Sequence, residues 1–315
     1  CIACSIRGSI MPSTDTIGPV SPRAAQRELP RGARRFAAEL LRSPKGITGF
    51  ALVLAVLLLA LCAPWAATND PAEQVIAHRF LPPFWEEGGK LTHPFGGDNL
   101  GRDIFSRAVH GTRTSVEVAL IVTVAIVVLG TLIGLASGYF GRAVDAVLMR
   151  IVDFQLSFPF ILLALLLLAI LGKGFWTLVL ALSVAFWVNI ARLVRGETLR
   201  IRELEFVQAA RGMGVPEWRI IAGHILPNTL PAIVVLATLD VAVIVLAEAA
   251  MSFLGLGIQP PTPSWGTMIS DGRNYLYEAP WMTLAPGLGI MLTAIGINLL
   301  GDFLRDTYDP RLAQR

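Results

Sequence analysis

Charged residues are scarce in this chain of 315 residues: Asp, Glu, Lys and Arg make up 16% of it, whereas hydrophobic residues make up 54%. The mean hydropathy is +0.62. A soluble domain of this length carries more charge, because its surface must face water. The excess apolar surface therefore indicates a protein that lies in a lipid bilayer. The net charge of +3 is too small to indicate a nucleic-acid-binding surface, so we expect no nucleic-acid partner.

The residues that build catalytic and metal sites are also few. Cys1 and Cys4 form a C-x-x-C without the βαβ context of a redox pair, and Cys62 lies in an apolar run. The phosphate-binding pattern G-x-x-x-x-G-K-[ST] is absent, since "LGKGF" (171–175) lacks its spacing. We expect no catalytic residue, no metal and no cofactor bound by this chain, so any ATP chemistry belongs to a partner. The histidines are scattered, at His78, His93, His110 and His224.

Long apolar runs dominate the rest of the sequence. The first, "GITGFALVLAVLLLALCAPWA", holds no charge and has about the 20 residues that cross a bilayer. A cleaved secretory signal has a shorter apolar region, so we expect this segment to be retained. Five similar runs follow, and the sequence predicts an all-α polytopic membrane protein with six transmembrane helices. They are expected at residues 46–66, 116–140, roughly 145–171, 175–194, roughly 229–251 and 282–304.

The basic residues predict the orientation of these spans. Most of the 26 Lys and Arg residues lie on the inner side if the N-terminus is cytoplasmic. Residues 1–45 are then a cytoplasmic segment, a disordered tail followed by an amphipathic helix on the membrane surface. An ordinary solvated helix start is the alternative for "RGARRFAAELLR" (31–42). Residues 67–115 and 252–281 lie outside, and 305–315 form a cytoplasmic C-terminal tail.

The first outer loop contains one predicted helix. Asp98 or Asn99 is placed to cap it. Its apolar side would consist of Leu100, Ile104, Phe105 and Ala108. Such a helix is either a platform for an external partner or a plain cover of the bundle.

A short charged insert interrupts the apolar runs. In "QAARGMGVPEWRIIAGHILPN" (208–228), Gly214 is placed to end one helix and Pro216 to start another. Helices this short need a partner surface. We predict a helix–turn–helix that Pro227 closes. Its two apolar stripes are Phe206, Ala209, Ala210 and Met213, then Trp218, Ile221, Ala222 and Ile225. They dock either on this chain's own bundle or on another protein.

Several acidic residues lie within or beside the predicted spans, where charge is costly. Asp240 and Glu248 are eight residues apart in the fifth span, about two turns of one helix face. They are candidates for a polar translocation path, and a contact within the bundle is the alternative, which we favour for Glu248. Asp145 and Asp153, near the inner end of the third span, are expected to pair locally with Arg150.

The insert resembles the EAA loop of permease subunits of ATP-binding-cassette importers. The family pattern is Glu-Ala-Ala, three residues, Gly, nine residues and Ile-x-Leu-Pro, and Gln208 and His224 depart from it here. The resemblance runs from about residue 40 to 312 and is closest to the C-type subunit of dipeptide and oligopeptide importers (DppC/OppC). The stretches that carry it are "HPFGGDNLGRDIFSRAVHGTRTS" (93–115), "GYFGRAVDAVLMRIVDFQLSFP" (138–159), "AEAAMSFLGLGIQPPTPSWGTMISDGRNYL" (247–276) and "DPRL" (309–312).

This resemblance implies a type I importer permease fold in a bacterial inner membrane, with residues 116–304 as the permease core and an EAA loop at about 196–228. It implies half of a heteromeric pore for di- and oligopeptides, completed by a B-type permease. Two cytoplasmic ATPases, which carry ATP and Mg, would dock on the EAA loop, and an extracytoplasmic binding protein would deliver peptide. The implied coupling residues are Glu205, Gln208, Ala209, Ala210, Gly214, Trp218, His224, Leu226 and Pro227.

Other functions stay open at this point. A permease of the same family could carry nickel or another small solute. An autonomous secondary carrier would show inverted repeats and broken spans around a midplane ion site, and no clear repeat is visible. A membrane scaffold that transports nothing would not need Asp240.

Overall fold

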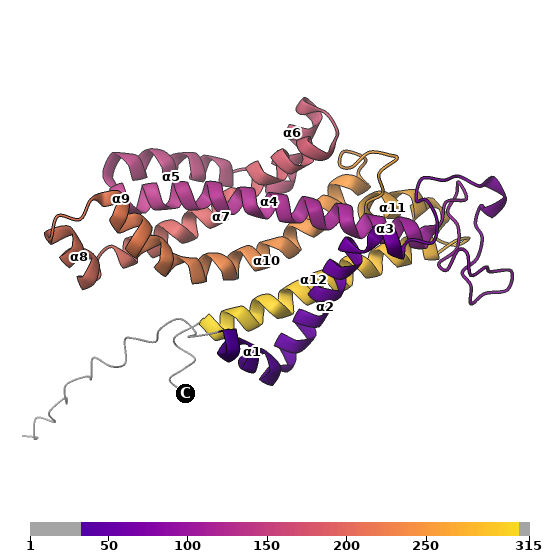
Figure 1. Cartoon of the computed structure of the whole chain (residues 1–315). Helices are drawn as coiled ribbons and strands as arrows, with labels where there is room; N and C mark the ends of the chain where they lie inside the picture. Colours follow the sequence, from indigo (N-terminus) through magenta and orange to yellow (C-terminus); the bar gives the residue numbers. More distant parts are fainter. Residues whose placement is uncertain (1–32, 309–315) are drawn as a thin grey trace, which may run out of the picture.

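The computed structural model describes residues 33–308, and Figure 1 shows that helices make up most of this part. Five helices are long and apolar enough to cross a membrane. They are α2 (Pro44–Leu61), α4 (Ile104–Phe140), α7 (Phe175–Ile201), α10 (Leu226–Phe253) and α12 (Trp281–Tyr308). The predicted all-α polytopic fold is confirmed.

Shorter helices connect the long ones or lie at their ends. The N-terminal segment contributes α1 (Ala33–Arg42), which falls on the predicted surface helix; the predicted tail before it lies outside the described residues. The others are α3 (Ala63–Ala66), η2 (Ile76–His78), α5 (Arg142–Leu156), α6 (Phe160–Leu171), α8 (Glu205–Gly212), α9 (Glu217–Ile220), η3 (Ile221–Ile225), α11 (Trp265–Gly272) and η4 (Arg273–Tyr275).

The third predicted span is not one continuous helix. It consists of α5 and α6, which are bent by 88° at residues 157–159, so the count of spans is six only if this pair is one span. Pro159 lacks an N–H group, and a proline disfavours the helical conformation of the residue before it, here Phe158. The expectation of a straight helix over 145–171 is therefore corrected.

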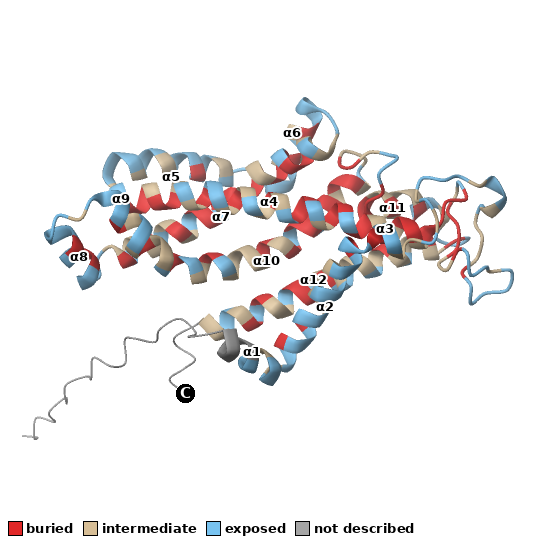
Figure 2. Ribbon diagram, in the orientation of Figure 1, coloured by how far each residue is buried: buried red, intermediate tan, exposed pale blue. Residues whose placement is uncertain are grey.

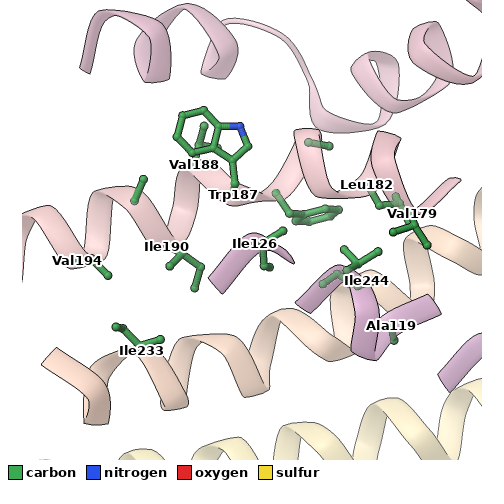
Figure 3. Packing of buried hydrophobic residues seen from close by; sticks show 14 of the residues in the cluster. Ala119, Ile126, Val179, Leu182, Trp187, Val188, Ile190, Val194, Ile233 and Ile244 are labelled. Atoms are coloured by element: carbon green, nitrogen blue, oxygen red, sulfur yellow. The ribbon is translucent and has the colours of Figure 1, made fainter. Parts of the chain in front are cut away.

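Close packing of α4 against α7 forms the centre of the molecule. Three glycines one turn apart, Gly130, Gly134 and Gly138, bring the two backbones together. A Cβ at Gly134 would lie 2.6 Å from the carbonyl oxygen of Ala191. Figure 3 shows Ile126 of α4, Ile190 and Val194 of α7 and Ile233 and Ile244 of α10 in one buried cluster. Because α4 has no side chain at these three positions, α7 can approach its backbone closely.

The pair α2 and α12 forms a second layer beside α10 (Figure 1). An apolar cavity of about 290 Å³ lies where α2, α4, α10 and α12 meet, lined by side chains that include Val56, Ala119 and Ala237. Figure 2 shows buried residues along the facing sides of α4, α7 and α10, and exposed ones on much of α2, α5 and α6. Leu58, Phe154 and Leu162 are among these exposed apolar residues. Such outward-facing apolar side chains fit contact with lipid.

The first outer loop ends later than its predicted cap. Asp103, rather than Asp98 or Asn99, caps α4, since its carboxylate accepts a hydrogen bond from the N–H of Ser106 at 3.0 Å. There is no separate capped helix over 100–108, because Ile104 already begins the long helix α4. Of the predicted apolar residues, Ile104, Phe105 and Ala108 thus belong to the first turns of α4, and Leu100 lies in the loop before it.

Candidate functional site: the α8–α9 end

The charged insert folds as two short helices at one end of the bundle (Figure 1). α8 ends at Gly212, Gly214 follows with a φ of +76°, and Pro216 is the N-cap of α9. A positive φ is readily adopted only by glycine, so the helix end predicted there follows from this residue. The sequence thus predicted the turn and both helix ends beside it.

The second helix is not closed by Pro227. α9 continues through the π turn η3, in which the N–H of Leu226 bonds to the carbonyl of Ile221, and passes directly into α10. Pro227 lies in the first turn of α10, where a missing N–H costs little. The second helix of the insert and the fifth span are therefore continuous.

The two predicted apolar stripes do not each face one surface: some of their residues are buried in the bundle and others are exposed. Of the first stripe only Ala210 is buried, beside Val207, whereas Phe206 is 45% exposed and Met213 77%. In the second stripe Ile225 is buried and Trp218 is 65% exposed. Val207, Ala210, Ile220 and Ile225 belong to this chain's core cluster. Phe206, Ala209, Met213 and Trp218 remain exposed, and we call this set the outer apolar face.

Few contacts hold α8 in place. The side-chain amide of Gln208 donates to the carbonyl oxygen of Arg202 at 2.9 Å, and Nη1 of Arg202 donates to the carbonyl of Gly138 at 2.6 Å. The Arg211 guanidinium lies over the ring of Tyr139, 5.3 Å from its centroid. These contacts tie α8 to the C-terminal end of α4.

The remaining predicted coupling residues lie around this end. The imidazole of His224 meets the ring of Phe206 edge to face, with 6.1 Å between centroids. Glu205 is exposed in the first turn of α8, where a carboxylate complements the helix dipole. Leu226 and Pro227 are half-buried. The structure therefore brings all nine predicted residues to one end of the molecule.

The acidic residues near the inner end of α5 pair across to α7 and not locally. Asp145 accepts two hydrogen bonds from Arg195, at 2.6 and 2.7 Å, and Asp153 accepts one from Arg192 at 2.7 Å. The expected pairing with Arg150 is wrong, because the fold places α7 alongside α5. Partners about 40 to 50 residues away cannot be found from helical spacing.

Both candidate path residues on α10 are buried inside the chain. Glu248 is 0% exposed and accepts hydrogen bonds from the hydroxyls of Ser115 and Ser252, both at 2.7 Å. Asp240 is 6% exposed, and its Oδ2 has no hydrogen-bond partner among the described residues. Glu248 is thus engaged in a bundle contact, the alternative that was favoured for it.

A second cluster, at the opposite end, was missed by the sequence analysis. Asp98 accepts hydrogen bonds from Nε of Arg102, at 2.5 Å, and from Nη1 of Arg107. Nη2 of each arginine donates to Asp271, at 3.1 and 3.0 Å. We call these four residues the outer ion-pair cluster. The sequence "DNLGRDIFSR" (98–107) brings Asp and Arg residues close enough to pair locally. Asp271, however, lies more than 160 residues away from both arginines, so its part in the cluster could not be predicted.

Among residues 33–308, no three His, Cys, Asp or Glu side chains are grouped so that they could hold a metal ion. What the described chain offers is a helical membrane bundle with a short apolar-faced helix pair at one end. The class defined by the fold is therefore a multi-pass membrane protein, with two of its long helices, α7 and α10, flanking that helix pair.

Comparison with known families identifies the chain more closely. Residues 130–314 match the family described as "Binding-protein-dependent transport system inner membrane component", and residues 33–83 match the "N-terminal TM domain of oligopeptide transport permease C". The chain belongs to this family of importer permeases, in its C-type branch. The resemblance seen in the sequence is confirmed.

Three curated relatives extend the match over most of the chain. The dipeptide transport system permease protein DppC of Alkalihalophilus pseudofirmus is 40% identical, over 87% of this chain and 88% of its own. The probable D,D-dipeptide permease DdpC of Escherichia coli is 39% identical, over 85% and 88%. A putative peptide permease of Brucella suis is 42% identical, over 88% and 91%.

Proposed function

We propose that this chain is one of two permease subunits of an ATP-driven importer of di- and oligopeptides. The relatives' names supply the substrate class, since they refer to dipeptide or peptide transport. These names do not favour the alternative of nickel or another small solute. A B-type permease would complete the pore, an extracytoplasmic binding protein would deliver the peptide, and lipid would cover the remaining apolar surface.

The observation that carries the coupling role is the outer apolar face of α8 and α9. Met213 and Trp218 are large apolar side chains exposed at the end of a membrane protein, beside charged residues such as Arg211 and Glu217. An exposed apolar patch with a polar rim is typical of a protein–protein interface. We infer that a cytoplasmic ATPase covers this face, that a second ATPase covers its counterpart on the partner permease, and that both carry ATP and Mg.

Movement of the docked ATPase would be transmitted to the membrane helices because the α8–α9 pair is joined directly to α7 and α10. α8 follows α7 after three residues, and α9 passes into α10 without a break. A shift of the helix pair therefore acts on two neighbouring spans at once, as a rigid lever. This chain itself would contribute no catalytic group to ATP hydrolysis.

The orientation belongs to the same proposal. With the termini and the α8–α9 end in the cytoplasm, Thr262 lies outside and Glu217 inside. In a variant without native cysteines, Thr262→Cys should react with an impermeant thiol reagent on intact cells, and Glu217→Cys should react only after lysis. Labelling of Glu217→Cys in intact cells would reverse the orientation.

Copurification of the ATPases with variants of this chain tests the coupling role. Met213→Asp and Trp218→Asp place a charge on an exposed position, so the fold should be kept. We expect each to lower ATPase copurification and peptide uptake about tenfold or more, as for the central residues of an interface. Glu203→Gln, at an exposed residue of the same end, is the matched control and should change neither. Wild-type copurification in both Asp variants would mean that the ATPases dock elsewhere.

Reconstitution distinguishes this role from the other classes. Alone in proteoliposomes, the chain should neither hydrolyse ATP nor concentrate peptide. Uptake should appear only with the second permease, the ATPases and the binding protein. Concentrative uptake by this chain alone on a proton or sodium gradient would support a secondary carrier.

A further inference from the structure

The break between α5 and α6 lies at the depth of the membrane. The side chain of Gln155, next to the break, donates to the carbonyl of Val184 at 2.5 Å and accepts from the indole N–H of Trp187 at 2.9 Å. Val184 lies about 14 Å along α7 from Phe175, counted at 1.5 Å per residue. Because a bilayer core is about 30 Å thick, this level is near its middle.

Irregular backbone at this depth needs an explanation. In a membrane it is tolerated only where protein buries it or where it lines a water-filled cavity. Ser157, Phe158 and Pro159 are all exposed on this chain, so the chain itself does not bury them. The N–H groups of Ser157 and Phe158 donate to the carbonyls of Phe154 and Gln155, but side chains of this chain do not cover the break. Contact with water or with another chain therefore fits this surface better than contact with lipid.

Polar groups continue from the break toward the α8–α9 end. Asn189 of α7 is exposed, and it lines a cavity of about 150 Å³ together with Gln155 and Phe158. One turn further along α7, the Asp153–Arg192 ion pair has side chains that are 60% and 53% exposed. Exposed charges of this kind are costly against lipid, so this surface faces water or protein in the assembly.

The hydrogen-bonding groups of this surface are not equivalent. Gln155 is engaged on both sides of its amide by α7, so it fixes the position of the bend. The Asn189 side-chain amide makes no hydrogen bond within the described residues, and it lies beside the aromatic rings of Phe158, Phe160 and Phe186. An amide between aromatic side chains matches a peptide, which offers backbone N–H and C=O groups and apolar side chains.

From this juxtaposition we propose that the α5–α7 surface, from Ser157 and Asn189 to the Asp153–Arg192 pair, is this chain's wall of the translocation path. Asn189 hydrogen-bonds the backbone of the passing peptide there. This assignment rests on the proposed import of peptides. It places the path on a different surface from Asp240 and Glu248, which are buried in the chain.

Thiol accessibility in the assembled importer tests the path. In a chain whose native cysteines are replaced, Ser157→Cys and Asn189→Cys should react with a small impermeant methanethiosulfonate added from the ATPase side. A transported peptide should slow this reaction. Leu132→Cys of α4 and Ile170→Cys of α6 are matched controls, because both positions are exposed but apolar, and they should stay unlabelled.

Uptake by Asn189 variants gives an independent measure. Asn189→Leu should reduce peptide uptake about three- to tenfold, the size expected for one hydrogen bond. Asn189→Gln should retain more uptake, and thermal stability should not change for either variant because the side chain is exposed. Unchanged uptake by Asn189→Leu would show that Asn189 does not bind the passing peptide.

The two proposals fail in different ways. If the wild-type complex takes up no peptide in the same proteoliposomes, the proposed function is wrong. If uptake is normal but the cysteines react only in the isolated chain, the partner permease covers this surface, and the path assignment alone is overturned. Cysteines that are unreactive in both preparations would place lipid there, which also overturns it.

Discussion

The two ends of the molecule differ in which side chains they bury: one holds a buried ion-pair cluster, and the other exposes apolar side chains on a short helix pair. At the end predicted to lie outside, which we call the outer end, Asp98, Arg102 and Arg107 have side chains that are 2%, 10% and 6% exposed. They are paired with one another or with Asp271. At the α8–α9 end, large apolar side chains are exposed and only a few hydrogen bonds hold α8. The charged groups of the ion-pair cluster have their partners within this chain, whereas the side chains of Met213 and Trp218 at the α8–α9 end are left uncovered by it.

This difference indicates how each end responds to change. Removing one member of a buried ion-pair cluster leaves charges without partners, so the free energy of unfolding decreases. Changing an exposed apolar side chain leaves the fold intact and alters what binds to it. Variants at the outer end should therefore reduce stability, and variants at the inner end should reduce transport.

Asp98→Ala is expected to have the largest effect. It leaves Arg102 and Arg107 buried with Asp271 as their remaining acidic partner, and breaking a buried pair typically costs about 3–5 kcal/mol. We expect a marked loss of folded protein in detergent, measured by thermal unfolding and size-exclusion profile. Glu86→Ala, at an exposed residue of the same loop, should have almost no effect. A wild-type unfolding midpoint for Asp98→Ala would show that the cluster does not stabilise the outer end.

Two glycines with nearly the same positive φ, one at each end, allow a direct comparison. Gly101 at the outer end and Gly214 between α8 and α9 have φ values of +75° and +76°. A Cβ at Gly101 would clash with the carbonyl oxygen of Val75, whereas one at Gly214 would meet nothing within 4 Å. Alanine at Gly214 should thus cost only the strain of the left-handed conformation, about 1–2 kcal/mol.

We expect Gly101→Ala to lower the yield of folded protein, and Gly214→Ala to keep the yield but lower uptake. Gly214→Val should lower uptake further, because a branched side chain is more strained at positive φ. Expression level and uptake, measured side by side, check both. Equal losses of folded protein from Gly101→Ala and Gly214→Ala would contradict the proposed difference between the ends.

Gln208→Glu should be mild. The change removes the amide donor to the Arg202 carbonyl, an exposed hydrogen bond whose loss costs about 1 kcal/mol or less. It also restores the residue of the family pattern. We expect ATPase copurification within about twofold of wild type, and a loss like that of Met213→Asp would show that this amide is part of the interface.

The smallest effect concerns pH at the outer end. Burial lowers the pKa of His93 below its ordinary value, although Asp103 and Glu73 oppose this shift. The unfolded chain therefore binds a proton more readily than the folded one, so stability falls as pH drops below about 6.5. His93→Gln should flatten the dependence of the unfolding midpoint on pH between pH 7.5 and 5.5. If the unfolding midpoint of His93→Gln depends on pH as steeply as that of the wild type, other titratable groups cause the dependence.

Many features of the fold could be predicted from the sequence because they depend on local composition. Runs of about 20 apolar residues leave few options besides a membrane helix, and Gly214 followed by Pro216 specifies a helix end and a helix start. The nine coupling candidates come together at one end because they are close in the sequence. The outer ion-pair cluster could not be found this way, since four spans separate Asp98 from Asp271 in the sequence.

The sequence by itself determined that this chain is an all-helical membrane protein with a short helix pair between its fourth and fifth spans. Only the tertiary structure decided that Val207 and Ala210 face the bundle while Met213 faces outward, because stripe spacing does not tell which side of a helix its neighbours cover. It also decided that Asp145 meets Arg195 and that the third span bends at Pro159 with polar groups beside the bend. Those outcomes depend on where distant helices pack, and packing is a property of the whole chain and not of any one segment.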